Sequence, residues 1–189
     1  MKNNLIELLE AEASRNQINY ILTLIGEDEK SISTLVDLAL FGKYPHANRA
    51  AWTLDVLDRK HPELITPHLK TLLSHLRNIK SDSVKRPVFS ILSKRKLPKK
   101  HQAFLIDYCF DILQNNNEKI ASRVFSMEIL AKIAEDEPDL LTELLSVIDM
   151  HYDNASAGFK SRARNIRKRL IVGATLAVAH PRDHPIKNQ

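Results

Sequence analysis

The nine residues Val84-Lys85-Arg86-Pro87-Val88-Phe89-Ser90-Ile91-Leu92 carry the pattern that decides the fold of this 189-residue chain. Val84, Val88 and Ile91 are spaced i, i+4, i+7, which places three apolar side chains on one face of an α-helix. The pattern predicts four copies of one helix, because the same spacing recurs and successive copies are offset by 37, 36 and 39 residues. The other copies are Ala47, Ala51 and Leu54; Ile120, Val124 and Met127; and Phe159, Ala163 and Ile166.

A period of this length corresponds to one helical hairpin. A single hairpin cannot bury its own apolar face, so consecutive hairpins stack on one another. We therefore predict an all-α fold, a right-handed α-solenoid (an α-α superhelix) of about five hairpins that forms one domain over residues 1–179. The scarcity of glycine, four residues in 189, favours helices over strands and turns. Residues 180–189 contain two prolines and few apolar side chains, which predicts a flexible tail.

Apolar periodicity and helix-end residues predict ten helices. Gly26 and Gly42 suit helix ends, and Pro62, Pro98 and Pro138 suit first turns, where proline's missing amide hydrogen has no helical partner. The predicted helices are Lys2–Ser14, Gln17–Ile25, Ser31–Phe41, His46–Lys60, Pro62–Asn78, Asp82–Arg95, Pro98–Gln114, Asn117–Glu135, Pro138–Asp153 and Ser156–Val172. Pro67 and Pro87 fall inside two of them and predict a bend or a later start.

The second helix of each predicted hairpin resembles that of the HEAT repeat family, within the ARM/HEAT superfamily. Val84, Lys85, Val88, Ile91 and Leu92 fit the family pattern of an aliphatic, a basic, a small apolar and further apolar residues. Phe159, Lys160, Ala163 and Ile166 fit it as well, and Asp82 resembles the acid in the preceding turn, whereas Asn48 and Ala121 replace the basic residue. The resemblance covers residues 31–172. It implies an architecture and no particular activity.

Few residues in the sequence are arranged as catalysis or metal binding would require. His61, His68 and His75 are seven residues apart, about 10.5 Å along a helix, whereas zinc ligands lie about 2.0–2.1 Å from the ion. The acids at 27–29 and 135–139 lie at helix junctions, where they stabilise helix starts. Cys109 lies in an apolar run, which predicts a buried core residue. The sequence contains no phosphate-binding loop and no nucleophile motif. We therefore predict that the protein is not an enzyme and that it binds no cofactor, metal or small-molecule ligand.

Charge is distributed unevenly along the chain. Residues 121–155 carry a net charge of −6 and residues 156–189 a net charge of +7. Arg49, Arg86, Arg123 and Lys160 are spaced by 37 residues each, so in stacked hairpins they would occupy one row of the surface. With Arg164 and Arg167 of the last helix they are the predicted partner-binding residues. Two alternatives remain: each cation pairs with an acid of the neighbouring hairpin, or the last helix is a polar cap.

These observations predict a non-catalytic scaffold or adaptor that binds a protein with an acidic surface. The alternative is a nucleic-acid-binding α-solenoid, similar to the HEAT-like DNA-alkylation-repair proteins. Trp52, Phe89 and Phe125 recur at one repeat position and form either part of the core or an aromatic strip. The longest late apolar run, residues 170–179, is too short to span a membrane. With no signal segment at the N-terminus and one cysteine, the cytoplasm is the expected location.

Overall fold

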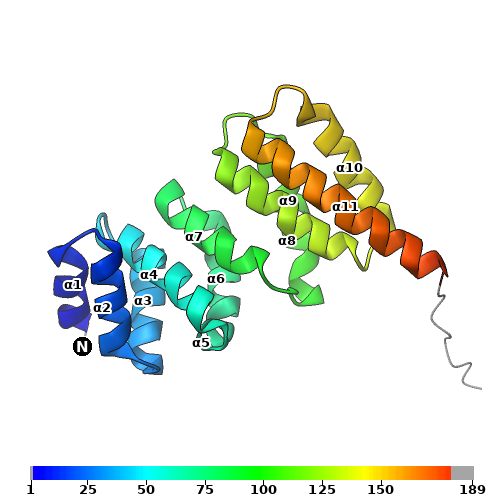
Figure 1. Cartoon of the computed structure of the whole chain (residues 1–189). Helices are drawn as coiled ribbons and strands as arrows, with labels where there is room; N and C mark the ends of the chain where they lie inside the picture. The colour runs from blue at the N-terminus through cyan, green and yellow to red at the C-terminus, as the bar shows by residue number, and fades with distance from the viewer. Residues whose placement is uncertain (1, 180–189) are drawn as a thin grey trace, which may run out of the picture. The chain divides into compact units, whose positions relative to one another are not determined.

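The computed structural model describes the backbone of residues 2–179 and the side chains of residues 4–137 and 139–170. All regular secondary structure in this part of the chain is helical (Figure 1). The chain divides into two compact units, residues 1–101 (unit 1) and residues 102–189 (unit 2). The predicted tail, residues 180–189, lies outside the described residues.

Unit 1 contains seven α-helices and three short 3-10 segments among its described residues. Helix α4 packs against α2, α3, α5 and α7, so it forms the centre of the unit. The elements are α1 (Lys2–Ala11), α2 (Arg15–Ile25), α3 (Glu29–Phe41), α4 (His46–Lys60), α5 (Pro62–Ile65), α6 (Leu69–His75) and α7 (Asp82–Ser93), with 3-10 turns at Thr66–His68, Leu76–Asn78 and Lys99–His101. The predicted helices that correspond to α2, α3, α4 and α7 are confirmed to within two residues at each end, whereas α1 ends at Ala11 and not at Ser14. The prediction that Pro98 opens a helix is wrong, because Pro98 precedes the 3-10 turn and the α-helix that follows starts only at Gln102.

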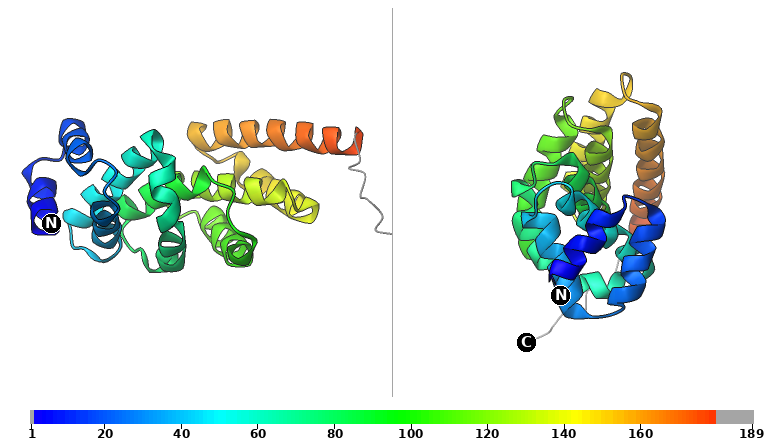
Figure 2. Two further views of the ribbon diagram at one scale, coloured as in Figure 1. Left: turned by 90° about the horizontal axis from the view of Figure 1, so that it is seen from below. Right: turned by 90° about the vertical axis from the view of Figure 1, so that its left-hand side faces the viewer.

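Unit 2 is built from two stacked hairpins. Its helices are α8 (Gln102–Gln114), α9 (Ile120–Ala134), α10 (Pro138–Tyr152) and α11 (Ala157–Ala179). Helix α9 packs against α8, α10 and α11, and Figure 2 shows the α9–α11 pair from two further directions. Both second helices of the unit therefore lie against each other, as stacking of repeats requires.

Local side chains explain several helix ends. The Ser14 hydroxyl accepts a hydrogen bond from the Gln17 amide (3.0 Å), and an Asp28 carboxylate oxygen accepts one from the Ser31 amide (2.9 Å). Both residues are N-caps, which satisfy amides that have no partner inside the helix. Hydrogen bonds from Ser31 also lower the pKa of Asp28. The acid at position 28 therefore has the structural role that its place at a helix junction predicts.

The two internal prolines have different consequences. At Pro67 the helix predicted over residues 62–78 breaks into α5, a 3-10 turn and α6. Pro87 lies inside α7, which starts at Asp82 as predicted and runs without interruption to Ser93. Proline removes one amide donor from a helix interior, and in α7 the apolar face around Pro87 is fully packed: Val88, Phe89 and Ile91 are each 0% exposed.

Three of the four predicted apolar triplets lie in the core. The triplets of α4, α7 and α11 are buried: Ala47, Ala51, Leu54, Val84, Val88, Ile91, Phe159, Ala163 and Ile166. The prediction for α9 is wrong at Ile120, which is 50% exposed, and at Val124, which is half-buried. Helix α9 begins at Ile120 itself, so its inward face lies further along the helix and includes Ser122, Ser126 and Ile129, all buried.

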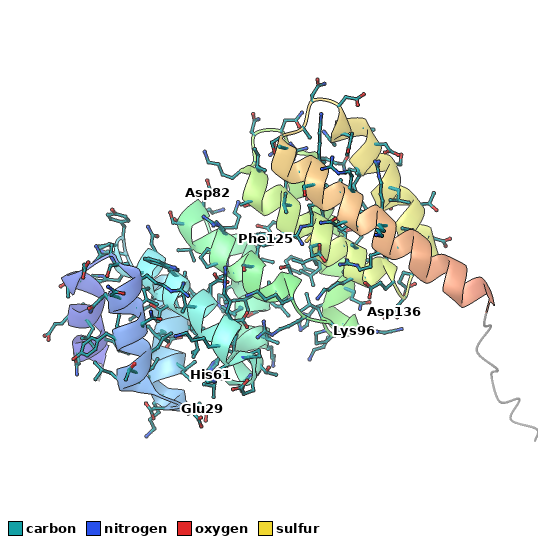
Figure 3. The ribbon with its side chains drawn as sticks, viewed as in Figure 1. Glu29, His61, Asp82, Lys96, Phe125 and Asp136 are labelled. Carbon is teal, nitrogen blue, oxygen red and sulfur yellow. The ribbon has the colours of Figure 1, made fainter. Side chains whose placement is uncertain are left out.

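The three aromatic residues at the shared repeat position have different environments. Phe89 is 0% exposed and belongs to the core of unit 1. Trp52 is half-buried, and so is Phe125, which Figure 3 labels. Core packing therefore accounts for Phe89 completely and for the other two in part.

Candidate functional site

Three basic side chains of α11 gather around one tyrosine of α10. Lys160, Arg164 and Arg167 are spaced i, i+4, i+7 and so share one helix face. The Lys160 ammonium lies 5.6 Å and the Arg167 guanidinium 4.9 Å from the centre of the Tyr152 ring. Arg164 Nη1 donates a hydrogen bond to the Tyr152 hydroxyl (3.3 Å). We call these four residues the Tyr152 cluster.

Acidic side chains neutralise only part of the Tyr152 cluster. Arg167 pairs with Asp149 of α10. Lys160 donates to the backbone carbonyl of Asp153 (2.9 Å), which is a neutral acceptor. Among the described residues no carboxylate pairs with Lys160 or with the exposed Arg164. The cluster therefore presents positive charge to solvent.

On another face of α11 the cations are paired with acids of α9. Glu128 accepts hydrogen bonds from Arg162 (3.2 Å) and from Arg169 (2.6 Å). Arg169 also lies 3.3 Å from a carboxylate oxygen of Glu135. Pairing with the neighbouring hairpin, one alternative for the basic residues, thus holds for Arg162 and Arg169.

Two further basic residues, Lys94 and Arg95 at the end of α7 in unit 1, are also paired with acids of a neighbouring helix. Lys94 lies 2.8 Å from Asp58 and 3.4 Å from Asp55, and Arg95 also pairs with Asp58. Burial acts to raise the pKa of Asp55, but hydrogen bonds from Ser90 and Arg59 and the charge of Lys94 outweigh it and lower that pKa. These two cations stabilise the contact between α4 and α7, and they leave little charge for a partner.

The predicted row of four cations divides between the two units. In unit 1, Arg49 is half-buried and donates to the Leu9 carbonyl, whereas Arg86 is exposed and makes no hydrogen bond or ion pair with the described residues. In unit 2, Lys160 belongs to the Tyr152 cluster. Arg123 is 9% exposed and its Nε donates to the Leu113 carbonyl (2.9 Å). Arg123 therefore lies in the interior and not on an exposed surface.

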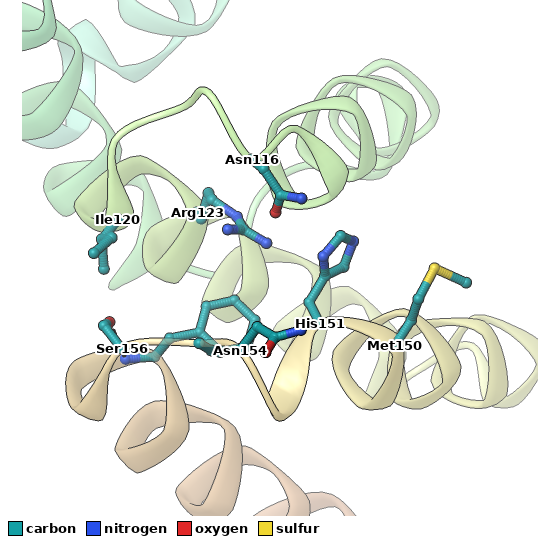
Figure 4. A pocket seen from close by; sticks show the side chains of 9 residues that line it. Asn116, Ile120, Arg123, Met150, His151, Asn154 and Ser156 are labelled. Atoms are coloured by element: carbon teal, nitrogen blue, oxygen red, sulfur yellow. Dashed lines mark hydrogen bonds between the residues drawn. The ribbon is translucent and has the colours of Figure 1, made fainter.

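Arg123 lines a pocket of about 540 Å³ in unit 2 (Figure 4). The pocket is formed by the α8–α9 loop, the start of α9, the end of α10 and the start of α11. Its wall includes Asn116, Ile120, His151 and Asn154. Its size lies within the range of about 300–1,000 Å³ that is typical of ligand pockets. No sequence pattern predicts this pocket, because its residues come from four separate segments.

Burial affects the charged groups of this pocket. It lowers the pKa of the Arg123 guanidinium, and burial together with the charge of Arg123 lowers the pKa of His151. Both effects favour the neutral form of the His151 imidazole. Arg123 Nη2 is buried and has no hydrogen-bond partner among the described residues. The guanidinium lies 5.2 Å from the centre of the Phe159 ring.

The three spaced histidines do not converge. His61 is exposed, His68 is buried with its Nε2 unpaired within the described part of the chain, and His75 contacts Phe41 edge to face. Among the residues that were described, no group of three or more His, Cys, Asp or Glu side chains is arranged to hold a metal ion. Cys109 is fully buried, as predicted, and burial raises the pKa of its thiol to about 12.

Comparison with known proteins identifies the architecture. Residues 5–170 match the HEAT repeat domain family, and the chain belongs to that family. The fold is similar to the crystal structure of an engineered protein from the Northeast Structural Genomics Consortium, with a TM-score of 0.58, 15% identity, and coverage of 91% of this chain and 80% of that one. No curated protein matches the chain. The predicted all-α solenoid class is thereby confirmed.

No helix within the described residues has the length and apolar character needed to cross a membrane. The family match indicates a repeat scaffold, and the similar structure supports the fold alone. They assign no partner to it.

Proposed function

We propose that this protein is a non-catalytic scaffold that binds a protein with an acidic surface, and that the Tyr152 cluster on α11 is a main contact. The observation that carries the proposal is the placement of Lys160, Arg164 and Arg167 around one ring, with no carboxylate partner for two of them among the described residues. HEAT repeats serve as interaction surfaces in many proteins, which supports this reading.

The geometry of the cluster suits a carboxylate-bearing partner. An arginine guanidinium presents donors in a planar fork that matches a carboxylate with two parallel hydrogen bonds. Contact with Tyr152 restricts the side chains of Arg164 and Arg167, so less side-chain entropy is lost when a partner binds. The exposed Lys168 and, in unit 1, the exposed Arg86 add positive charge that steers an acidic partner.

Nucleic acid is the second candidate, because basic residues along a helix can contact successive phosphates. The surroundings of the cluster disfavour it. Asp149 pairs with Arg167 within the cluster, and residues 121–155 carry a net charge of −6. Acids this close repel an extended polyphosphate chain, whereas a protein partner places its own charges individually. We therefore favour a protein.

Site-specific photo-crosslinking tests the proposal. A benzophenone amino acid replaces the exposed Ser161, next to Lys160 on α11, in one sample and the exposed Asp107 of α8 in a control, and each protein is irradiated in extract from its source cells. We expect a discrete protein adduct from position 161 only, with an acidic surface in the identified partner. The adduct from position 161 should disappear in the Arg164→Glu/Lys168→Glu variant and persist in Lys99→Glu/Lys100→Glu. Adducts insensitive to both variants contradict the proposal.

Fluorescence anisotropy with a 20-base-pair DNA duplex and a 20-nucleotide RNA tests the second candidate. Binding that neutralises several phosphates weakens steeply as salt rises, with a log-log slope of about −0.9 for each contact on duplex DNA. We expect no saturable binding at 50 mM salt. Tight binding with a steep slope that Arg164→Glu/Lys168→Glu reduces would favour nucleic acid instead.

A further inference from the structure

We propose that the pocket beside Arg123 in unit 2 is a binding site for a carboxylate carried on an apolar stem. The proposal concerns a different site from the Tyr152 cluster and does not depend on the proposed function. It rests on a buried cation without a carboxylate partner among the described residues, on polar side chains around it, and on two exposed apolar side chains that line the same pocket.

Arg123 is the first reason to expect an anion. The residue is 9% exposed, yet within the described part of the chain no carboxylate pairs with it, and the one hydrogen bond that its side chain makes there runs from Nε to the Leu113 carbonyl. A charge taken out of water without a counter-ion is costly. The face of the Phe159 ring compensates part of that cost through a cation–π contact. A bound anion would supply the missing negative charge.

The neighbouring polar groups can complete an anion site. Figure 4 shows Asn116, His151 and Asn154 arranged around the Arg123 guanidinium. Both amides can donate hydrogen bonds, and a neutral imidazole donates one. Helix α11 starts at Ala157 beside the pocket, and the positive end of its dipole adds to the attraction for a negative charge.

Two exposed apolar side chains line the pocket. Ile120 is 50% exposed and Met150 is 74% exposed, and both line the pocket. Large apolar side chains exposed beside a buried cation suit a ligand with one apolar end and one anionic end. Methionine in particular adapts its shape to varied apolar groups.

The number of positive charges in the pocket favours a carboxylate ligand over a phosphate ligand. Arg123 is the one arginine or lysine among the residues that line the pocket, and its charge favours the neutral form of the neighbouring His151. One positive charge balances the single negative charge of a carboxylate. A phosphate monoester carries close to two negative charges at this pH, and one of them would remain unbalanced. The carboxylate can belong to a free organic acid or to the C-terminus of a peptide.

Isothermal titration calorimetry on the full chain tests the site with sodium hexanoate, with hexanamide as the neutral probe of the same shape and hexyl phosphate as the dianion. We expect saturable binding of hexanoate, at least tenfold weaker binding of hexanamide, and weaker binding of hexyl phosphate. Equal binding of hexanoate and hexanamide overturns the proposal.

Two variants locate the binding. Asn116→Asp and Asn154→Asp each place a carboxylate at the pocket, at positions that are exposed and therefore tolerant of substitution. Each should weaken hexanoate binding at least tenfold, whereas Asn165→Asp, an exposed position on α11 that does not line the pocket, should leave it unchanged. Arg123→Met is the direct variant. If it does not fold, the two asparagine variants still decide the matter, and unchanged affinity in both overturns the proposal.

Two peptides distinguish the sources of the carboxylate. The first is acetyl-Gly-Gly-Ala-Leu with a free C-terminus, and the second is the same peptide with a C-terminal amide. Binding of the peptide with the free C-terminus but not of its amide, together with loss of that binding in Asn116→Asp, assigns the site to a peptide terminus. Binding of hexanoate without binding of either peptide assigns it to a free organic acid. Absence of binding by hexanoate and by both peptides overturns the proposal.

Discussion

Asp58 of α4 accepts a hydrogen bond from Arg95, which follows α7 and stands 37 residues further along the chain, one repeat away. The side chain of Asp58 is 0% exposed, and Lys94 lies 2.8 Å from its second carboxylate oxygen. One buried acid thus neutralises two basic residues of the next hairpin. The stacking of α4 and α7 consequently depends on charge as well as on apolar burial.

Replacing Asp58 with Asn tests how much this contact stabilises unit 1. The change leaves Lys94 and Arg95 without their carboxylate, and breaking a buried ion pair costs about 3 kcal/mol. We expect a fall in melting temperature of several degrees, measured by circular dichroism. Asp107→Asn, at an exposed position of α8, is the matched control and should change stability by less than about 0.5 kcal/mol. Equal melting temperatures for both variants would contradict this role.

Asp55 makes the free energy of unfolding of the protein depend on pH. Its pKa is lower in the folded protein than the ordinary value of 3.8, so its ionised form stabilises the fold. This stabilisation is complete above about pH 4 and is lost as the pH falls through the lowered pKa. In urea titrations we expect Asp55→Asn to be less stable than the natural protein at pH 6, and the difference to shrink at pH 3. A difference that is independent of pH would show that the charge of Asp55 is not responsible.

The positions of the helices could be predicted because their signals are local. Apolar spacing, prolines in first turns and glycines at helix ends define α3, α4, α8 and α10 to within a few residues. The prediction from the third apolar triplet was wrong because the inward face of α9 depends on the residue at which the helix starts and on the three helices packed around it. At Ile120 the sequence pattern fits a core position, yet the side chain lines a pocket.

The candidate site was predictable only in part, for a related reason. Arg164 and Arg167 stand out in the sequence through the charge of the last helix, whereas Tyr152 carries no repeat signal, and its role depends on how α10 and α11 pack. Arg123 was selected by its spacing from Arg86, but spacing does not determine burial. The surroundings of Arg123 come from four segments that only the fold brings together.

Gly42 should not tolerate alanine. It ends α3 with its amide bonded to the Leu38 carbonyl, and a Cβ at this position would collide with that same carbonyl oxygen. Relief of such a clash requires the backbone to move, which costs about 1–3 kcal/mol. Gly158→Ala is the matched control, because a Cβ there meets nothing closer than 4.0 Å and the residue lies in the first turn of α11. We expect opposite signs in chemical denaturation: a loss of stability at position 42 and a gain at position 158.

Cys109 should be inert to thiol reagents in the folded protein. Its side chain is 0% exposed on α8, and burial raises its pKa to about 12, so at pH 8 only about one molecule in 10,000 carries the reactive thiolate. With Ellman's reagent we expect no release of product from the native protein over minutes and one equivalent in 6 M guanidinium chloride. Asp107→Cys, exposed two residues earlier on the same helix, provides the control and should release one equivalent without denaturant. Rapid reaction of native Cys109 would mean that α8 separates from α9 under native conditions, and the hairpin would then be far less stable than its buried core implies.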